Sequence, residues 1–394
     1  MKVLIVSDNG TTTGYGRIAD EIGMRLHKRG HNIMALGYYY DGLLPPQLDG
    51  VKLPYWVGSL ASKPNVMQSV AGVMGAFDPD IVLSIQDFPY HVQLFHGSGV
   101  DWSKHGRVLI TPVDGVPVEP DWIRLAQSVD GVATISQFGV EAFKAQGVQA
   151  TLCRPGVNVD TFHRLHDEKR AELRGKLGLA PDAFLLGSMC QNQGRKAVTL
   201  MMRGFNEFAK DKPNARMLLD MDEVSPAGWN LPNIIEVQGW DASKFLFRRH
   251  AVDAGVVSLN ERYNILDAHV VLAHREGYGL PLSEAMACGV VSIAMDYCSG
   301  TEIVGEGRGV LIPTTDYTVP GTWGGAEDRF PNMAAYVERL QWLHDSPFER
   351  HAMAQRGMAW AREHTWDGAA DAVETMLLSV DGKRRAWQAQ GVAA

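Results

Sequence analysis

Hydrophobic residues in this chain fall in short, uninterrupted runs rather than at alternating positions. The runs are rich in Val, Ile and Leu and are separated by stretches that suit helices. They are Val3–Ser7, Ile33–Tyr39, Ile81–Ile85, Val108–Val113, Val132–Ile135, Thr151–Cys153, Phe184–Met189, Met217–Asp220, Ile234–Val237, His269–His274, Val290–Met295 and Gly309–Ile312. Uninterrupted runs are typical of strands covered on both faces, as in parallel sheets built from βαβ units. The pattern therefore predicts an α/β protein.

The runs form two series, separated by a stretch rich in Pro, Gly and Asn at residues 154–160. Such a stretch is typical of a domain join. Two series fit two Rossmann-like domains, each a doubly wound parallel sheet, better than one large sheet. We place the first domain at residues 1–160 and the second at 161–365. A loop rich in Thr, Pro and Gly is expected at residues 314–325. The last predicted helices cover Asn332–Asp345, Pro347–His364 and Trp366 to about Ala386.

The most informative loop between predicted elements runs from His274 to Gly289. Open parallel sheets bind ligands at the carboxyl ends of their strands, so loops after strands are the candidates for function. Pro281 suits the first turn of a helix that Gly289 would end. Before that helix, the backbone of Gly277–Gly279 can approach a ligand and present free N–H groups. The loop is therefore typical of an anion site and suits a diphosphate.

Two carboxylates flank this loop. Glu276 precedes the glycines, and Glu284 lies one turn into the predicted helix. A carboxylate can accept hydrogen bonds from two vicinal hydroxyls, so one of the pair can face a sugar and the other a ribose. The simpler alternative is a solvated helix that follows a glycine turn. The agreement between the helix ends, the carboxylates and the glycines favours a binding site.

The same segment resembles a family signature. The spacing Glu276-x7-Glu284, followed by Ala285–Gly289 and then by Ser299–Glu302, is similar to that of GT-B-fold retaining glycosyltransferases of family 4, the glycosyl transferases group 1 type. Weaker similarity extends over nearly the whole chain. The resemblance implies an enzyme that moves a sugar from a nucleotide-diphosphate sugar, such as a UDP sugar, to a hydroxyl acceptor with retention of anomeric configuration.

The resemblance also implies a fold and a set of roles. The fold would be GT-B, with two Rossmann-like domains facing across a cleft and residues 366–394 forming a helix that crosses back to the first domain. Glu276 would contact the donor sugar and act in catalysis, while Glu284 would bind the ribose hydroxyls. The backbone amides that would hold the diphosphate belong to Gly277, Tyr278, Gly279 and Leu280.

A second loop, Gln191–Lys196, follows the first predicted strand of the second domain. Arg195 and Lys196 can neutralise a diphosphate and stabilise it as a leaving group. The family usually carries an Arg…Arg-Lys arrangement here; Lys196 matches its lysine, and Gln191 stands where the earlier arginine is expected. We predict that both cations bind the donor and that Lys196 acts in catalysis. By itself, a basic pair is also common in solvated loops.

A third loop, Asp8–Arg17, follows the first predicted strand. From Gly14 onward it formally matches the GxGxx[GA] fingerprint of dinucleotide binding. That fingerprint needs its first glycine directly at the strand end and an acid after the second strand. This loop is longer, and the second strand runs into Gly37–Tyr40. In the glycosyltransferase interpretation the loop closes over donor phosphate and acceptor, with Gly14, Gly16 and Arg17 nearest.

Asp114 is a further candidate for catalysis. It follows the fourth predicted strand, where many members of the family carry a histidine that faces the donor sugar. An Asp before a Gly is also ordinary turn chemistry, so both interpretations stay open.

We expect neither a metal nor a cofactor, because the nucleotide sugar is a substrate. Asp220 and Asp222 form a DxD pattern like that of the other large glycosyltransferase fold. Here the pattern ends a strand inside the second sheet, and amides and cations would handle the phosphate instead. The histidines show no HExxH spacing, so a zinc site of that type has no support.

Composition and charge narrow the classes of partner. Of 394 residues, 45% are hydrophobic, yet no window approaches the roughly 20 apolar residues of a membrane helix. The N-terminal run is too short for a signal peptide, so a cytoplasmic location is expected. The net charge is −8, which disfavours nucleic acid.

Several features stay open at this stage. The donor base, donor sugar, hydroxyl acceptor and oligomeric state do not follow from these residues. A sugar-nucleotide epimerase or glycoside phosphorylase on the same fold, or a donor-binding scaffold without activity, are alternatives to the transferase.

Overall fold

The structure is a computed structural model that describes residues 1–43, 45–61, 66–321 and 324–389. Its chain forms two compact units. One comprises Met1–Gly156 together with Trp366–Ala394, and the other comprises Val157–Thr365.

The first unit is built on a seven-stranded parallel sheet with the order β5-β2-β1-β6-β7-β8-β9. Its strands are β1 (Lys2–Ser7), β2 (Asn32–Gly37), β5 (Trp56–Ser59), β6 (Ile81–Ile85), β7 (Gly106–Thr111), β8 (Gly131–Thr134) and β9 (Thr151–Leu152), with a small hairpin of β3 (Gln47–Leu48) and β4 (Val51–Lys52). Its helices are α1 (Gly14–Lys28), α2 (Val66–Phe77), α3 (Phe88–Gly97), α4 (Pro120–Ser128), α5 (Gln137–Lys144) and α15 (Trp366–Ala389). The strand order reverses between β1 and β6, so the chain continues toward opposite edges of the sheet after these two neighbouring strands.

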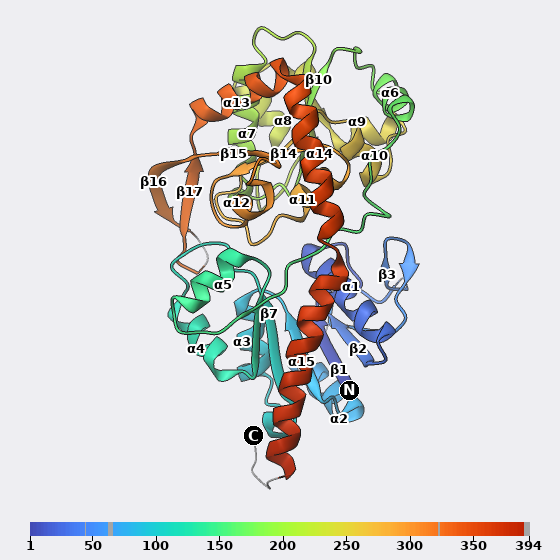
Figure 1. The fold of residues 1–394 in the computed structure, drawn as a ribbon, viewed down its shortest axis with the longest axis vertical. Helices are drawn as coiled ribbons and strands as arrows, with labels where there is room; N and C mark the ends of the chain where they lie inside the picture. Colours follow the sequence, from blue (N-terminus) through green and yellow to red (C-terminus); the bar gives the residue numbers. More distant parts are fainter. Residues whose placement is uncertain (44, 62–65, 322–323, 390–394) are drawn as a thin grey trace. The chain divides into compact units, whose positions relative to one another are not determined.

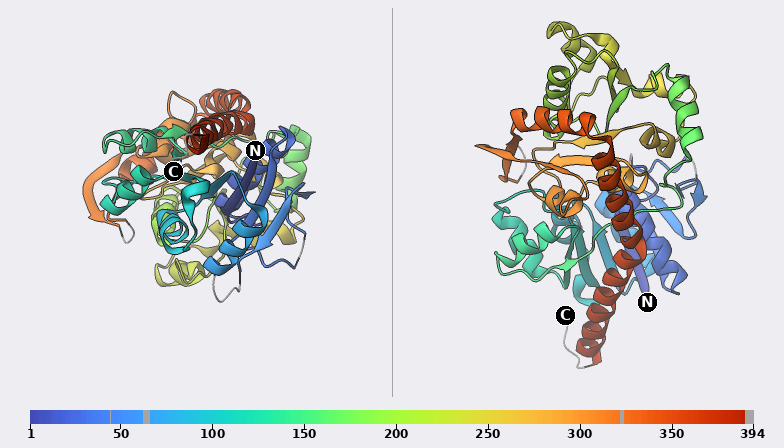
Figure 2. Two further views of the ribbon diagram at one scale, coloured as in Figure 1. Left: turned by 90° about the horizontal axis from the view of Figure 1, so that it is seen from below. Right: turned by 45° about the horizontal axis from the view of Figure 1, so that its top comes forward.

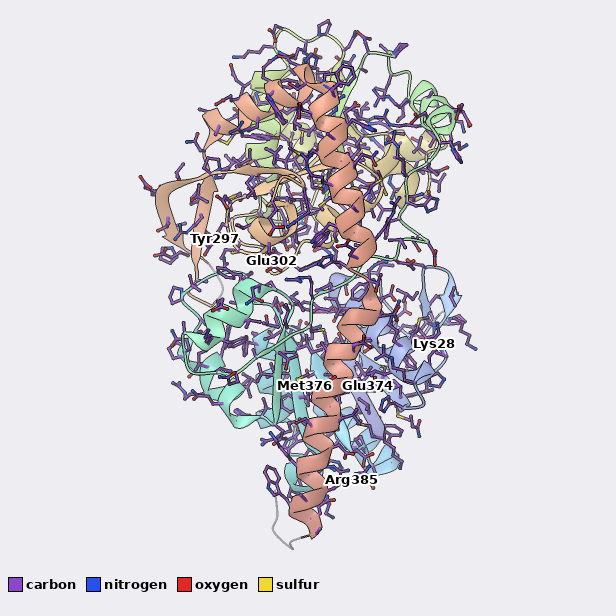
Figure 3. The ribbon with its side chains drawn as sticks, in the orientation of Figure 1. Lys28, Tyr297, Glu302, Glu374, Met376 and Arg385 are labelled. Carbon is purple, nitrogen blue, oxygen red and sulfur yellow. The ribbon has the colours of Figure 1, made fainter. Side chains whose placement is uncertain are left out.

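Helix α15 covers one face of this sheet although it is distant from it in sequence (Figures 1 and 2). It packs against α1 and against β7, β8 and β9. Gly106 lies under it, where a Cβ atom would come within 2.8 Å of Val380 Cγ1. Glu374 and Met376 lie on this helix (Figure 3), and Glu374 Oε2 accepts a hydrogen bond of 2.7 Å from Arg29, the residue that follows α1. Apolar packing and ion pairs therefore join α15 to the first unit.

The second unit is built on a six-stranded parallel sheet with the order β12-β11-β10-β13-β14-β15. Its strands are β10 (Phe184–Met189), β11 (Ala215–Asp220), β12 (Phe245–Phe247), β13 (Ala268–Val271), β14 (Val291–Met295) and β15 (Val310–Ile312), and a separate hairpin is formed by β16 (Thr314–Pro320) and β17 (Glu327–Pro331). Its helices are α6 (Asp167–Lys176), α7 (Val198–Phe208), α8 (Leu231–Val237), α9 (Arg248–Asp253), α10 (Leu259–Asn264), α11 (Leu280–Ala287), α12 (Ser299–Val304), α13 (Met333–Asp345) and α14 (Pro347–Glu363). Here the order reverses between β10 and β13.

The strands of both sheets could be predicted from uninterrupted hydrophobic runs because their residues are buried on both faces. Residues Val3–Val6 of β1 are fully buried, as are Leu185 and Leu186 of β10, because helices cover both faces. Tyr336 and Leu340 of α13 are fully buried in the core that also contains Phe205 of α7. The predicted parallel α/β architecture is confirmed in each unit.

The predicted strand Ile234–Val237 is wrong, because this segment ends helix α8. Asn230 caps the helix by accepting a hydrogen bond from the Asn233 N–H at 3.1 Å, and Pro232 lies in its first turn. A short apolar run does not distinguish a strand from a buried helical turn. The edge strand of the second sheet is instead β12, and β5 of the first sheet was also missed.

The loop predicted at residues 314–325 is largely the antiparallel hairpin of β16 and β17. Residues 322–323 of that loop, and 390–394 of the predicted C-terminal segment, lie outside the described residues. The hairpin stands out from the second unit in Figure 1.

Within the chain that the structure describes, no helix combines the length and the apolar character needed to cross a bilayer.

A buried carboxyl group holds the loop after β1 in place. Asp20 of α1 accepts hydrogen bonds from Asn9 Nδ2 at 2.8 Å and from the Gly10 N–H at 2.9 Å. Burial raises the pKa of Asp20 from 3.8 to about 6. A group whose pKa is higher in the folded state than in the unfolded state stabilises the fold when it is protonated. The stabilisation is complete at a pH below the pKa of the unfolded state, and it is lost as the pH rises through the pKa of the folded state.

We predict that Asp20→Asn changes how stability depends on pH. Relative to the variant, the wild-type free energy of unfolding should rise by about 2 kcal/mol between about pH 7.5 and about pH 4.5, since only the wild type takes up the proton at this site on folding. Urea unfolding at several pH values measures the difference. The exposed Asp41 provides the control substitution Asp41→Asn. Parallel wild-type and Asp20→Asn curves would contradict the assignment.

Candidate donor site

The candidate site lies where the strand order of the second sheet reverses. The loops that follow β10 and β13 leave neighbouring strands at this point, and such a reversal is where open α/β sheets bind ligands. The His274 N–H donates a hydrogen bond of 2.8 Å to the Arg195 carbonyl. The topology therefore brings the two predicted donor loops, some 80 residues apart in sequence, into direct contact.

Lys196 and Glu276 form an ion pair in this contact. Arg195 lies further out, with Nη1 at 3.7 Å from Glu276 Oε1 and at 3.2 Å from the Arg275 carbonyl, to which it donates. The Lys196 and Glu276 side chains are only 10% and 15% exposed, whereas that of Arg195 is 38% exposed. Three of the predicted site residues are therefore together, and one cation is open to solvent.

The charges of this cluster set one another's protonation. Burial alone raises the pKa of Glu276, but the charges of Lys196 and Arg195 outweigh it and hold that pKa below its ordinary value. Burial, and then repulsion from Arg195, lowers the pKa of Lys196, while Glu276 opposes this effect. The carboxylate is thus kept ionised by two cations that sit in a partly desolvated place, where an added anion would interact with them strongly.

The loop between Glu276 and α11 has a fixed backbone. Gly279 caps the helix with φ of +99°, a conformation that residues with a Cβ rarely adopt. The Ser299 hydroxyl, fully buried, lies 2.9 Å from the Glu276 carbonyl and 2.6 Å from that of Tyr278. Pro281 stands in the first turn, where its missing N–H removes no helical bond. The helix N-terminus predicted from the sequence is present. Its first residue, Leu280, follows Glu276 by four positions.

Glu284 lies deeper, on the buried side of α11. Its Oε2 accepts a hydrogen bond of 2.9 Å from the Tyr263 hydroxyl of α10. Tyr263 is fully buried, and burial raises its pKa well above the ordinary value. It therefore stays a neutral donor. Its role in orienting Glu284 was not predicted, because a single buried aromatic residue carries no motif in sequence.

The hairpin of β16 and β17 is attached to the same site. Asp328 Oδ1 accepts a hydrogen bond of 2.6 Å from Arg275 Nε, and the Arg275 side chain is only 5% exposed. The Arg329 N–H donates to the His274 carbonyl at 3.3 Å, and the Arg329 carbonyl lies 2.8 Å from His274 Nδ1. The two residues before Glu276 are thus held by the hairpin on one side and by Arg195 on the other.

The predicted site residues of the first unit lie at the reversal of its own strand order. Thr13 caps α1 by accepting from the Gly16 N–H at 3.0 Å, and its hydroxyl donates to Asp8 at 2.8 Å. A Cβ atom on Gly16 would lie 2.6 Å from a backbone oxygen of the loop, so only glycine fits. Gly14 begins the helix, and Arg17 is paired with Asp49 at 3.0 Å.

Asp114 is half-buried in the segment after β7. It belongs to the first unit, as do Gly14 and Gly16. The three residues thus belong to segments that follow β1 and β7 of one sheet, in a different unit from Glu276 and Lys196.

The structure also shows the surroundings of the DxD pattern and of Gln191. Asp220, of the DxD pattern, pairs with Arg248 at 2.5 Å and also with Arg262, so its charge is already neutralised. Among the described residues, no group of three or more His, Cys, Asp or Glu side chains could hold a metal ion. Gln191, at the position of the expected arginine, accepts a hydrogen bond of 2.6 Å from Gln193.

Similar proteins of known identity point to one family. Residues 253–319 match the family model described as glycosyl transferases group 1. The chain is 27% identical over 248 residues to D-inositol 3-phosphate glycosyltransferase of Kineococcus radiotolerans, which covers 59% of this chain and 52% of that protein. It is 28% identical over 261 residues to the protein of the same name from Actinosynnema mirum, covering 64% and 57%. The chain thus spans about half the length of the curated relatives it matches.

Solved structures extend the similarity to the whole fold. Sucrose-phosphate synthase from Thermosynechococcus elongatus superposes with a TM-score of 0.75 at 15% identity, over 97% of this chain and 99% of that one. Anabaena HepE in complex with UDP-glucose gives 0.72 at 17% identity, over 96% and 100%. The family resemblance and the GT-B fold expected from the sequence are confirmed. The chain thus has the GT-B fold, and it is similar to the glycosyl transferases group 1 family, whose model it matches at residues 253–319.

Proposed function

We propose that this chain transfers a sugar from a nucleotide-diphosphate sugar to a hydroxyl acceptor with retention of anomeric configuration. The observation that carries the proposal is the contact between Glu276 and Lys196, with Arg195 beside them, at the N-terminal end of α11. Relatives named as D-inositol 3-phosphate glycosyltransferases and a similar structure solved with UDP-glucose support it.

The cluster supplies the charges that such a transfer needs. When the bond between the anomeric carbon and the diphosphate breaks, negative charge grows on the phosphate oxygens and positive charge on the sugar ring. Lys196, Arg195 and the first amides of α11 stabilise the former, because cations and amides are fixed before the reaction starts. In this proposal Glu276 binds the hydroxyls of the donor sugar, and Glu284, which accepts a hydrogen bond from Tyr263, binds the ribose.

The proposal needs neither a metal nor a cofactor, because these cations and amides carry the phosphate charge. For retention without a protein nucleophile, the acceptor attacks on the face from which the diphosphate leaves. The leaving phosphate then accepts the proton of the attacking hydroxyl. Asp114 and the glycine loop of the first unit, with Gly14 and Gly16, are our candidates for the acceptor side. A UDP sugar is the first donor to test.

The first prediction concerns phosphate binding. Lys196→Ala should weaken the binding of a nucleoside diphosphate about ten- to a hundredfold and leave that of the nucleoside unchanged, since charge-assisted hydrogen bonds are worth about 1.5–3 kcal/mol. Calorimetric titration with both ligands measures this. Lys244→Ala changes a lysine elsewhere in the second unit, whose ammonium donates to the Lys212 carbonyl, and serves as the control. Equal losses for nucleoside and diphosphate would assign Lys196 a structural role.

The second prediction separates the two glutamates. Glu284→Gln keeps an oxygen for Tyr263 but removes the charge offered to the ribose, so nucleoside diphosphate binding should weaken about ten- to a hundredfold. Glu276→Gln should not weaken that binding, because a nucleoside diphosphate lacks the donor sugar that Glu276 would contact and because Lys196 is released from its partner. Its loss should appear in turnover with the full donor.

Paired titrations and turnover assays decide between the outcomes. Equal losses of diphosphate affinity in the two variants would refute the division of roles. Full activity in both variants would refute the transferase itself.

The third prediction concerns the hairpin. Asp328→Ala frees Arg275, which precedes Glu276, so turnover should fall about tenfold, since misplacing reacting groups by about 1 Å can cost about 100-fold. Nucleoside diphosphate affinity should stay within about twofold, because Lys196 and α11 are untouched. Asp328→Asn keeps an acceptor for Arg275 and should recover part of the turnover. Asp316→Ala, on the exposed strand β16, is the control. If Asp328→Ala lowers the melting temperature but leaves turnover unchanged, the positioning role is refuted.

A further inference from the structure

A cavity of about 140 Å³ lies at the opposite edge of the second sheet from the donor loops. Its walls come from the segment before α6, from α6 itself, from the residues that lead into β13 and β14, and from the first turns of α14. Helices α6 and α14 and strand β14 are labelled in Figure 1. The donor loops follow the carboxyl ends of β10 and β13, whereas Asp267 and Gly289 precede the amino ends of β13 and β14. The cavity is therefore separate from the donor site, with the length of the sheet between them.

The charges around this cavity are unequal. Among the described residues that line it, Asp267 is the one carboxylate, against Arg164, Arg170, Arg350 and the exposed His351. A buried cation without an anionic partner lowers the stability of the fold, so the arginines of this cavity should have such partners.

Asp267 is already fully engaged. Its Oδ1 accepts from Arg170 at 3.0 Å, while its Oδ2 accepts from Arg174 at 3.0 Å and from the Leu185 N–H at 2.8 Å. Arg350 lies 3.8 Å away from Asp267, beyond hydrogen-bond reach. Asp267 thus neutralises the arginines of α6 and leaves the charge of Arg350 incompletely matched.

Arg350 and Arg164 have weak partners. Arg350 donates to the Leu343 carbonyl and lies over the Phe184 ring at 5.5 Å, neither of which is an anion. Burial lowers the pKa of Arg350, and the charges of Arg170 and Arg174 add to this effect against the opposing charge of Asp267.

Arg164 completes the wall beside Gly289. It pairs at 2.7 Å with Asp167, which is 82% exposed, and a pair so open to water contributes little. Its stem lies against the cavity floor, since a Cβ atom on Gly289 would come within 3.2 Å of Arg164 Cδ. Two guanidinium groups therefore border the same hollow without a buried anion of their own.

We propose that this cavity binds a phosphate dianion, either free or as the phosphate group of a small monoester, with Arg164 and Arg350 as its main ligands. Guanidinium groups present paired donors that match the oxygens of phosphate. The cavity has room for several water molecules and so for one tetrahedral oxyanion. Gly289 ends α11, so the bound anion would lie at the opposite end of that helix from the donor loop.

The test is calorimetric titration of the full chain with inorganic phosphate, and in a second arm with glycerol 3-phosphate. We expect saturable binding with a dissociation constant of about 1 mM or tighter. Arg164→Gln and Arg350→Gln should each weaken it about tenfold or more. Tighter binding of the ester than of phosphate would identify a monoester site, and equal binding a site for free phosphate.

Two controls separate this site from the donor site and from misfolding. Lys196→Ala should leave this binding intact, and so should Arg362→Gln, which changes an exposed arginine on the same helix as Arg350. If Arg350→Gln does not fold, Arg164→Gln still tests the proposal. The ion-pair partner of Arg164, Asp167, is exposed, so this variant should fold. The absence of saturable binding overturns the proposal. So does binding that Lys196→Ala abolishes and folded Arg164→Gln leaves unchanged, which would place the anion at the donor loops.

Discussion

The reversal of strand order between β10 and β13 is the constraint on which the site of the second unit depends. It leaves two loops side by side at the edge of a sheet, where partly buried charges of opposite sign meet. Lys196 alone in this position would be strongly destabilising, and Glu276 makes its burial tolerable. In the proposed function, an incoming diphosphate would meet cations whose positions are set by Glu276 and by the backbone around it. Ser299, Arg275 and the hairpin then keep the carboxylate's own backbone from moving.

The first unit uses the same topology with the opposite chemistry. At its reversal, Asp8 receives hydrogen bonds from Thr13 and Gln86, and Asp20 anchors the same loop from α1. Burial raises the pKa of Asp8 to about 6, as it does for Asp20. A carboxyl-rich loop suits hydroxyl groups, whereas the cation-rich loops of the second unit suit phosphate. The two sheets therefore share an architecture but differ in the ligands that their loop ends can hold.

The sequence predicted those parts of the fold that have a periodic or local signal. Uninterrupted apolar runs located most strands, and Pro281 and Gly289 located the ends of α11. The segment Ile234–Val237 was misassigned, since only its capping residue Asn230 reveals a helix. Among the predicted site residues, Lys196 and Glu276 belong to motifs in the sequence, and the structure brings these two into contact. Tyr263 and Asp328 were missed because each acts through a contact across many residues, and such contacts leave no local pattern.

Helix α15 has a consequence for how the chain is made. The face of the first sheet that spans β7, β8 and β9 is covered by residues 366–389, which a ribosome adds only after the entire second unit. Until then, the apolar residues beneath Val373 and Leu377, both fully buried in the finished fold, have no cover. The second unit, Val157–Thr365, is continuous in sequence and can complete its core first. The core of the first unit can therefore be completed only after the second unit has been synthesised, and its apolar surface stays uncovered until then.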